Sequence, residues 1–145
     1  SRLPKDICNA VQHHGITLLP ATPSFLTMLV AARLHKEYDL SSIKKITYGT
    51  EVMPQTTLSR LQSTFPDVSL QQTYGLSEVG VLGSKSRDDG SLWVKVGGKG
   101  FETIIVNGIL FIKSQYRMLG YLNAPSPFTE DGWFKTGWWQ RRYHW

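Results

Sequence analysis

A short polar segment, residues 72–78, carries the side chains whose types and spacing point most directly to chemistry. It combines an amide, an aromatic ring, a flexible glycine, a hydroxyl and a carboxylate, which belong to Gln72, Tyr74, Gly75, Ser77 and Glu78. A ring and an amide can hold an adenine, a glycine lets the backbone approach a phosphate, and Mg²⁺ prefers carboxylate oxygen. The segment therefore indicates a nucleotide site with a magnesium ligand, if the fold places it at a ligand-binding edge.

Hydrophobic periodicity in the first half of the chain predicts alternating helices and strands that provide such an edge. The expected helices are residues 4–14, a helix opened by Thr22-Pro23 that includes Leu34, and a helix opened by Pro54. The expected strands are residues 16–19, 42–48 and 68–73. This order is typical of a parallel sheet with right-handed crossovers, whose ligands bind at the carboxyl ends of the strands. The loops after the strands, residues 20–23, 49–54 and 74–80, are therefore expected to converge.

Beyond residue 83 the pattern changes to short strands separated by glycine and charged residues. Strands are expected at 92–96, 102–106 and 109–113, and Asn107-Gly108 between the last two is a strong hairpin signal because both residues tolerate positive φ. The fold class is thus α/β: a parallel βαβαβ subdomain at 1–83, followed by a small antiparallel β half-barrel at 84–137. Residues 138–145 form an atypical tail.

Composition excludes several other classes of protein. The formal net charge is +5, but the basic residues are scattered and form no stripe with interleaved aromatics, so no nucleic-acid surface is expected. The single cysteine, Cys8, rules out an internal disulfide and a cysteine zinc cluster, and it is expected to be buried in the first helix. No apolar run is long enough to cross a membrane, so a cytoplasmic protein without a membrane span is expected.

Four segments, in the same order along the chain, resemble those of the adenylate-forming enzymes, which comprise acyl-CoA synthetases, luciferases and the adenylation domains of peptide synthetases. Residues 74–78 resemble the Tyr-Gly-x-Thr-Glu signature, and residues 49–54 resemble the glycine-rich loop before a proline-led helix. Residues 119–123 and 128–137 resemble the Gly-Tyr-x-Asn and Gly-Trp-Phe-x-Thr-Gly-Asp segments. The chain therefore resembles the central part of the family's large N-terminal domain.

The resemblance implies an ATP-dependent acid–thiol ligase of the acyl-CoA synthetase type. Such an enzyme activates a small carboxylic acid as acyl-AMP, releases pyrophosphate, and transfers the acyl group to coenzyme A, so ATP, Mg²⁺ and CoA are the implied cofactors. On this template Tyr74 and Gly75 contact the nucleotide, with the ring stacked on adenine, and Gln72 hydrogen-bonds the exocyclic amine. Ser77, where the family usually has Thr, would donate to the α-phosphate, and Glu78 would ligate magnesium.

The same template gives a role to the loop after the second strand. There Gly49, Thr50 and Glu51 would form the wall between the adenine pocket and the acyl pocket.

Two departures from the family pattern matter for the isolated chain. The family's lysine-containing, Ser/Thr/Gly-rich loop that cradles the β- and γ-phosphates has no counterpart, and Trp138 stands where the family has an Asp that grips the ribose. The tail, residues 138–145, resembles neither the family's continuation nor its C-terminal domain with a catalytic lysine. We therefore expect an inactive fragment whose tail comes from a truncated or out-of-frame coding sequence.

Several alternatives remain open at this stage. The same motifs occur in adenylation domains that load a carrier-protein thiol, and the isolated chain could also be a non-catalytic nucleotide or acyl-binding module. Exposed strand edges or the tryptophan-rich tail could instead drive self-association. Thr22-Pro23 is better explained as a helix cap than as a ligand, and His13-His14 are better explained as structural residues at a helix end than as metal ligands.

Overall fold

The computed structural model of the chain describes residues 3–86, 91–92 and 94–139. They divide into two compact units. Unit 1 contains the described residues up to Gln72 together with residues 91–92, and unit 2 contains the described residues from Thr73 onward except 91–92. The structure divides between residues 72 and 73, whereas the sequence pattern places the boundary at residue 83. Each unit is described by itself.

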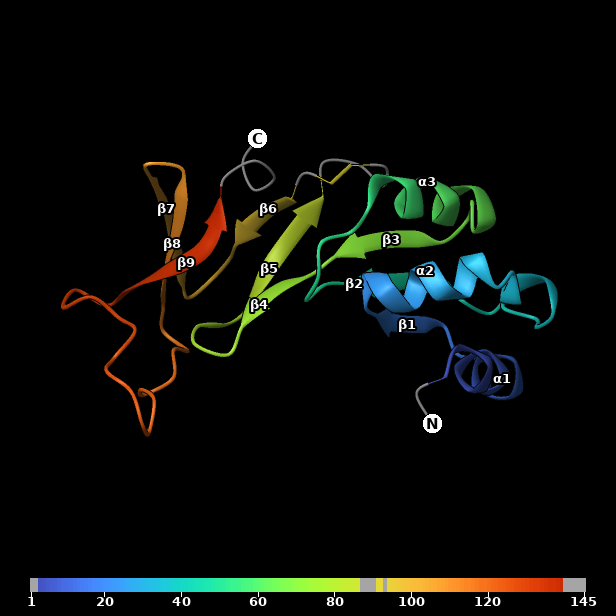
Figure 1. Ribbon diagram of the computed structural model, residues 1–145, viewed down its shortest axis with the longest axis horizontal. Helices are drawn as coiled ribbons and strands as arrows, with labels where there is room; N and C mark the ends of the chain where they lie inside the picture. Colours follow the sequence, from blue (N-terminus) through green and yellow to red (C-terminus); the bar gives the residue numbers. More distant parts are fainter. Residues whose placement is uncertain (1–2, 87–90, 93, 140–145) are drawn as a thin grey trace. The chain divides into compact units, whose positions relative to one another are not determined.

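Unit 1 has the alternating order of helices and strands that the sequence predicts. Its elements are α1 (Pro4–His14), β1 (Leu18–Ala21), α2 (Pro23–Ala31), the 3₁₀ helix η1 (Leu34–Lys36), β2 (Lys45–Tyr48), α3 (Gln55–Thr64) and β3 (Ser69–Gln72). The strands lie in the order β1-β2-β3, and both pairs are parallel. Figure 1 shows the helices of this unit lying alongside its sheet. The predicted parallel βαβαβ architecture is confirmed.

Local sequence signals explain where these helices begin and end. Gly15 follows α1 with φ 59°, a left-handed conformation that costs glycine little. The Thr22 hydroxyl accepts a hydrogen bond from the Phe25 backbone N–H (3.2 Å), which supports the interpretation of this threonine as a helix cap. The second helix is shorter than predicted, because Arg33 adopts φ 55° and Leu34 begins η1 instead of continuing α2.

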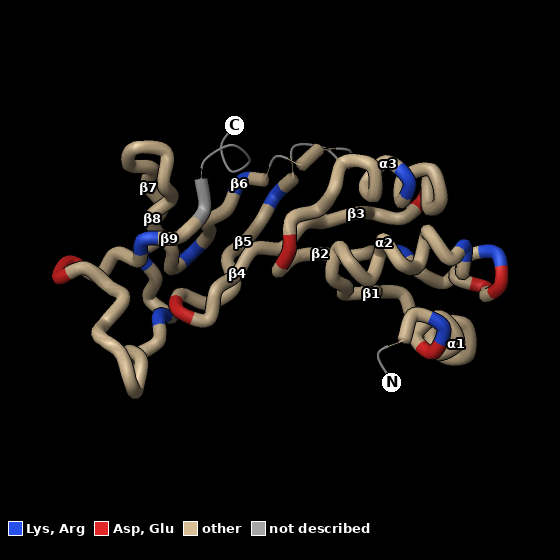
Figure 2. The backbone as a smooth tube through the Cα atoms, viewed as in Figure 1, with Lys and Arg blue, Asp and Glu red and all other residues tan. Residues whose placement is uncertain are grey.

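The core of unit 1 lies between the helices and the sheet. Leu26 on α2, Ile46 on β2 and Leu58 on α3 are fully buried, and Cys8 on α1 is 1% exposed, as predicted. Charged residues lie close together along the segment that follows α2 (Figure 2), and Glu37 in this segment forms an ion pair with Lys5 on α1 (3.6 Å). This unit thus has the polar surface and apolar interior of an independently packed layer.

Unit 2 is built from antiparallel strands. They are β4 (Tyr74–Leu76), β5 (Gly80–Ser86), β6 (Val94–Gly97), β7 (Phe101–Val106), β8 (Ile109–Ser114) and β9 (Trp133–Trp139). They form two three-stranded sheets, β4-β5-β6 and β7-β8-β9. The predicted hairpin is present, because Asn107 (φ 50°) and Gly108 (φ 77°) connect β7 to β8. The two sheets are open antiparallel sheets and not a closed barrel.

Two segments of unit 2 differ from the sequence-based expectation. Residues 74–76, expected in a loop, form a strand, because β4 pairs with β5 in the register Tyr74↔Leu82 and Leu76↔Gly80. Residues 138–139, expected to belong to the tail, lie in β9, which pairs with β8. The rest of the tail, residues 140–145, lies outside the described residues. Within the described part of the chain, no helix is long and apolar enough to cross a membrane.

Candidate functional site

The loops after β1 and β2 meet at the carboxyl edge of the unit 1 sheet, as the parallel topology requires. The Glu51 carboxylate accepts a hydrogen bond from the Ser24 backbone N–H (3.1 Å) and a second one from the Ser24 hydroxyl. Ser24 lies in the first turn of α2, where backbone N–H groups have no partner within the helix. Glu51 therefore neutralises the positive end of α2 and joins two loops of the candidate site.

The backbone of the second loop is held in an uncommon conformation. Thr50 has φ 68°, and a β-branched residue in this left-handed region is a genuine outlier. On either side the chain is anchored, because Tyr48 and Met53 are each 2% exposed. Strained positions of this kind are retained where the surrounding structure dictates them, and they cluster at ligand-binding loops. Thr50 therefore forms a constrained bend at this edge of the sheet, and the role of Gly49–Glu51 as a wall between the adenine and acyl pockets stays a prediction.

Gln72 ends β3 next to this loop. It is in register with Tyr48, the residue that immediately precedes Gly49, and its side chain is partly exposed. In unit 1 the structure therefore brings Gln72 to the same edge as Gly49, Thr50 and Glu51.

The signature segment 74–78 lies in unit 2 and forms β4 and the turn that follows. Tyr74 is 6% exposed and packs in a cluster with Val79 and Leu82, so little of its ring is available to a base in the described chain. Gly75 has a structural requirement, since a Cβ at this position would lie 3.1 Å from the Val81 Cα on the paired strand. Ser77 is exposed in the turn.

Glu78 is the best-defined polar group of unit 2. The Tyr121 hydroxyl donates a hydrogen bond to Glu78 Oε1 (2.6 Å), and the Met118 backbone N–H donates to the Glu78 carbonyl oxygen (2.9 Å). The hydrogen bond to the carboxylate, together with its negative charge, raises the pKa of Tyr121 above the usual tyrosine value. Sequence reasoning identified Glu78 but not its partner, although Tyr121 lies in the Gly-Tyr motif; only the fold reveals the contact.

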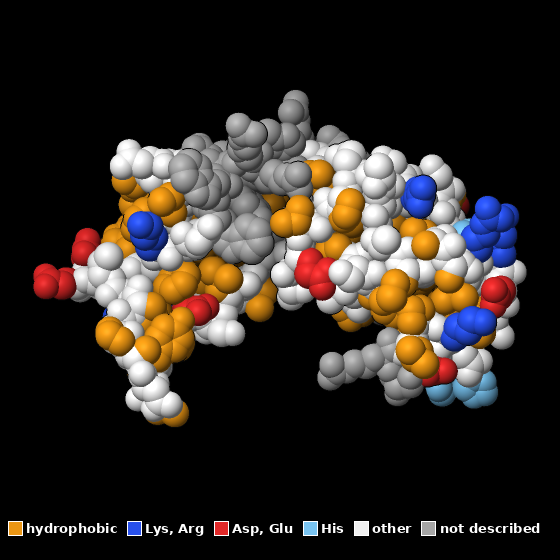
Figure 3. All heavy atoms as spheres, viewed as in Figure 1, with side chains coloured by type: hydrophobic (Ala, Val, Ile, Leu, Met, Phe, Trp, Pro, Cys, Tyr) orange, Lys and Arg blue, Asp and Glu red, His pale blue; other side chains and the backbone are white. Residues whose placement is uncertain are grey.

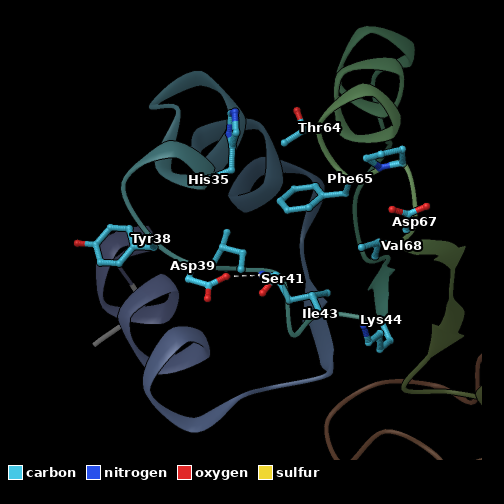
Figure 4. Close-up of a pocket in the computed structure, with 12 residues that line it drawn as sticks. His35, Tyr38, Asp39, Ser41, Ile43, Lys44, Thr64, Phe65, Asp67 and Val68 are labelled. Atoms are coloured by element: carbon cyan, nitrogen blue, oxygen red, sulfur yellow. Dashed lines mark hydrogen bonds between the residues drawn. The ribbon is translucent and has the colours of Figure 1, made fainter.

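A hollow in unit 1 lies at the opposite edge of the sheet. It has a volume of about 490 Å³, and its walls include His35 on η1, Asp39 and Lys44 before β2, and Phe65 and Asp67 after α3 (Figure 4). Asp39 is already engaged, since its carboxylate accepts a hydrogen bond from the Ser41 backbone N–H (3.0 Å). Hydrogen bonding to the Ser41 side chain, and then to this backbone N–H, lowers the pKa of Asp39. Ligands of parallel sheets bind at the carboxyl ends of the strands, and this hollow is at the amino ends of β2 and β3.

The side chains of the candidate site include few groups that could hold a metal ion. Among the described residues, no three His, Cys, Asp or Glu side chains come together as a metal site. Glu78 offers a single carboxylate with the Ser77 hydroxyl beside it in the turn. Mg²⁺ is commonly bound by one or two carboxylates plus substrate phosphates, so this donor set fits an ion that arrives with a nucleotide.

Comparison with known proteins identifies a family and a fold. Residues 1–122 match the family model described as AMP-binding enzyme. The chain is 28% identical to 3-[(3aS,4S,7aS)-7a-methyl-1,5-dioxo-octahydro-1H-inden-4-yl]propanoyl:CoA ligase of Mycobacterium tuberculosis, over 92% of this chain and 28% of that protein. It is also 28% identical to 4-coumarate–CoA ligase-like 9 of Arabidopsis thaliana, over 88% of this chain and 26% of that protein. The chain thus spans little more than a quarter of each relative.

Solved structures share the fold at lower sequence identity. The anthranilate CoA ligase AuaEII in complex with anthranoyl-AMP superimposes with a TM-score of 0.78 at 18% identity, over 94% of this chain and 29% of that chain. The luciferase-like enzyme from the mealworm Zophobas morio gives a TM-score of 0.71 at 23% identity, over 94% of this chain and 37% of that chain.

Proposed function

The chain belongs to the AMP-binding enzyme family, and from this premise we propose that the protein carrying it is an ATP-dependent acid–thiol ligase. In the first reaction a carboxylate oxygen attacks the α-phosphorus of ATP, pyrophosphate leaves, and an acyl-adenylate forms. In the second, the sulfur of a thiol attacks the acyl carbon, AMP leaves, and a thioester forms. One observation carries the proposal. Ser77 and Glu78 lie side by side in the turn after β4, and both belong to the segment that resembles the family signature.

Glu78 is proposed as the magnesium ligand. Its side chain is partly exposed, one of its oxygens accepts the Tyr121 hydroxyl, and the other has no hydrogen-bond donor among the residues that the structure describes. A bound Mg²⁺ would neutralise charge on the phosphates and so assist displacement of pyrophosphate. The role of this chain is to hold the Glu78 carboxylate in place before the nucleotide arrives.

The neighbouring residues are proposed to bind the adenylate. The exposed Ser77 hydroxyl can donate a hydrogen bond to an α-phosphate oxygen, and it retains the chemistry of the Thr that the family usually has there. Gln72 can pair with the exocyclic amine of adenine. Stacking of Tyr74 on adenine would require the base to reach a ring that is only 6% exposed in the described chain, so this residue is proposed only as an edge of the adenine-binding surface. Gly75 is proposed as the position that lets β4 and β5 approach closely.

The loop in unit 1 is proposed to separate the nucleotide from the acid. Thr50 holds a left-handed backbone conformation directly after Gly49, and Glu51 joins this bend to α2 through Ser24. Rate enhancement in a site of this kind comes mostly from positioning and from charge stabilisation at phosphorus. A rigid wall contributes the positioning.

The thiol is proposed to be that of coenzyme A, because the two relatives named above are CoA ligases. The first is named for an alicyclic acid and the second for its likeness to a ligase of an aromatic acid, and we propose a cyclic carboxylic acid here. Loading of a carrier-protein thiol, as in peptide-synthetase adenylation domains, is the alternative acceptor. Incubation of the purified acyl-adenylate with CoA or with a phosphopantetheinyl carrier protein distinguishes the two.

The test of the proposed function is acid-dependent exchange of radiolabelled pyrophosphate into ATP by the full-length protein, with a panel of alicyclic and aromatic acids. Glu78→Gln is expected to lower the exchange rate by about a hundredfold, because it removes a charged ligand and keeps the side chain's shape. Glu102→Gln is the matched control, since Glu102 is exposed on β7 of the same unit. Equal rates in the two variants would exclude Glu78 from the site.

A further inference from the structure

We propose that Tyr121 is a positioning residue for Glu78, whose phenol fixes one carboxylate oxygen so that the other is presented to a divalent cation. This inference rests on the proposed function, in which Glu78 ligates Mg²⁺. It adds a residue that the signature segment does not contain and assigns it an effect on cation binding.

The first support is the geometry of the contact. The Tyr121 hydroxyl lies 2.6 Å from Glu78 Oε1, within the range of a charge-assisted O–H···O⁻ hydrogen bond. A phenol has one proton to donate, so only one of the two carboxylate oxygens is occupied. No described residue donates to Oε2, which leaves that oxygen for a cation. A carboxylate held in this way is oriented for binding through a single oxygen.

The second support is a set of hydrogen bonds that fixes the backbone on which the contact depends. We call residues 114–121 the strap. At its start the buried Ser114 hydroxyl donates to the Val79 carbonyl (2.7 Å) and accepts from the Tyr116 backbone N–H (3.0 Å). In its middle the Met118 N–H donates to the Glu78 carbonyl (2.9 Å). The strap therefore forms hydrogen bonds with the backbone carbonyl groups of Glu78 and Val79 and with the Glu78 side chain.

The third support is that Tyr121 is not held in place by packing. Its side chain is 44% exposed, and the neighbouring Leu119 and Leu122 are fully exposed on the surface of unit 2, where Figure 3 shows hydrophobic side chains. Because Tyr121 does not belong to the hydrophobic clusters of the described chain, removal of its hydroxyl should affect the carboxylate far more than the fold. Outer-shell partners of metal ligands typically change metal affinity by about 10–100-fold when they are removed.

The test uses Mn²⁺ in place of Mg²⁺, because the enhancement of water-proton relaxation by protein-bound Mn²⁺ reports binding without turnover. The full-length protein is titrated into Mn²⁺–ATP without the carboxylic acid, and the enhancement relative to Mn²⁺–ATP alone gives the dissociation constant. The variants are Tyr121→Phe, Glu78→Gln and the control Tyr116→Phe. Tyr116 is a strap residue whose ring lies against Phe101 (5.6 Å between centroids), and its replacement also removes only a phenol hydroxyl. Thermal midpoints verify that all variants remain folded.

The inference predicts that Tyr121→Phe weakens Mn²⁺ binding by about tenfold, that Tyr116→Phe does not, and that Tyr121→Phe adds nothing further in a Glu78→Gln background. If Glu78→Gln weakens binding while Tyr121→Phe behaves like Tyr116→Phe, the positioning role is wrong and the proposed metal ligand stands. If Glu78→Gln leaves binding unchanged, the proposed ligand and the positioning role both fail.

Discussion

The carboxylate of Glu51 accepts hydrogen bonds from both the backbone N–H and the hydroxyl of Ser24. Glu51 lies in the loop after β2 and Ser24 in the first turn of α2, so the contact ties that loop to the helix N-terminus at the carboxyl edge of the sheet. It also satisfies a helix N-terminal N–H with a negative charge, an arrangement that is favourable for the helix dipole. The Glu51 side chain thus stabilises the N-terminus of α2 and fixes the position of a loop of the candidate site.

Replacement of this carboxylate should cost stability. Glu51→Gln is expected to lower the free energy of unfolding by about 1 kcal/mol, because the amide carries no charge to set against the N-terminus of α2. Urea denaturation monitored by circular dichroism measures the change. Asp67→Asn is the control, since Asp67 is an exposed acid of the same unit outside any helix N-terminus. Equal midpoints for the two variants would show that the contact contributes nothing.

Thr50 offers a prediction of opposite sign. A left-handed conformation destabilises the folded state by about 1–2 kcal/mol for an ordinary residue, and replacement by glycine removes this cost. Glycine in turn loses more backbone entropy on folding, which costs about 0.5–1 kcal/mol. With φ 68° at this position, Thr50→Gly should therefore stabilise unit 1 by about 0.5–1 kcal/mol. Thr47→Gly, in the extended strand β2, should instead destabilise the unit by about 1 kcal/mol. A loss of stability in both variants would mean that residue 50 is not strained.

Cys8 gives a prediction about reactivity and pH. Burial is the main cause that raises the pKa of the Cys8 thiol, and the Glu37 charge adds to it. At a given alkaline pH the folded chain therefore contains less thiolate than the unfolded chain, and the thiolate is the reactive form. Reaction with a disulfide reagent at pH 8 should be at least about tenfold slower for the folded chain than in urea.

The same shift affects stability. Because the folded pKa lies above the unfolded one, the contribution of Cys8 is fully present below its ordinary pKa and is lost as the pH rises through the raised value. Cys8→Ser lacks a thiol that titrates in this range, so its unfolding free energy should vary less with pH above neutrality. Chemical denaturation at several alkaline pH values measures the difference between the two slopes. If the unfolding free energies of the two proteins vary equally with pH, the raised pKa of Cys8 in the folded chain is wrong.

The parallel layer could be predicted because its signals are local. Gly15 and Thr22 mark helix boundaries through their own backbone and side chain, and buried positions such as Ile46 and Leu58 follow the expected periodicities. The predicted helix boundary was wrong where tertiary structure, and not the local sequence, determines the end of the helix. Leu34 fits the apolar face of α2, yet the left-handed Arg33 ends that helix first.

Pairing between distant strands could not be predicted in the same way. Residues 74–76 contain a glycine and precede polar residues, so they look like a loop until β5 supplies a partner. β9 pairs with β8 across a long irregular segment, and no local pattern specifies that register. The Tyr121–Glu78 contact has the same origin: each residue lies in a visible motif, but only the path of the strap joins the two motifs.

The measurement that tests the central claim most directly follows oxygen from the acid into the nucleotide. The full-length protein is incubated with ATP, Mg²⁺, CoA and a carboxylic acid labelled with ¹⁸O in both carboxyl oxygens, and the nucleotide products are analysed by mass spectrometry. Formation of an acyl-adenylate predicts that AMP carries one ¹⁸O atom for each thioester formed. Recovery of the label in inorganic phosphate with release of ADP, or thioester formation with unlabelled AMP, would contradict the account.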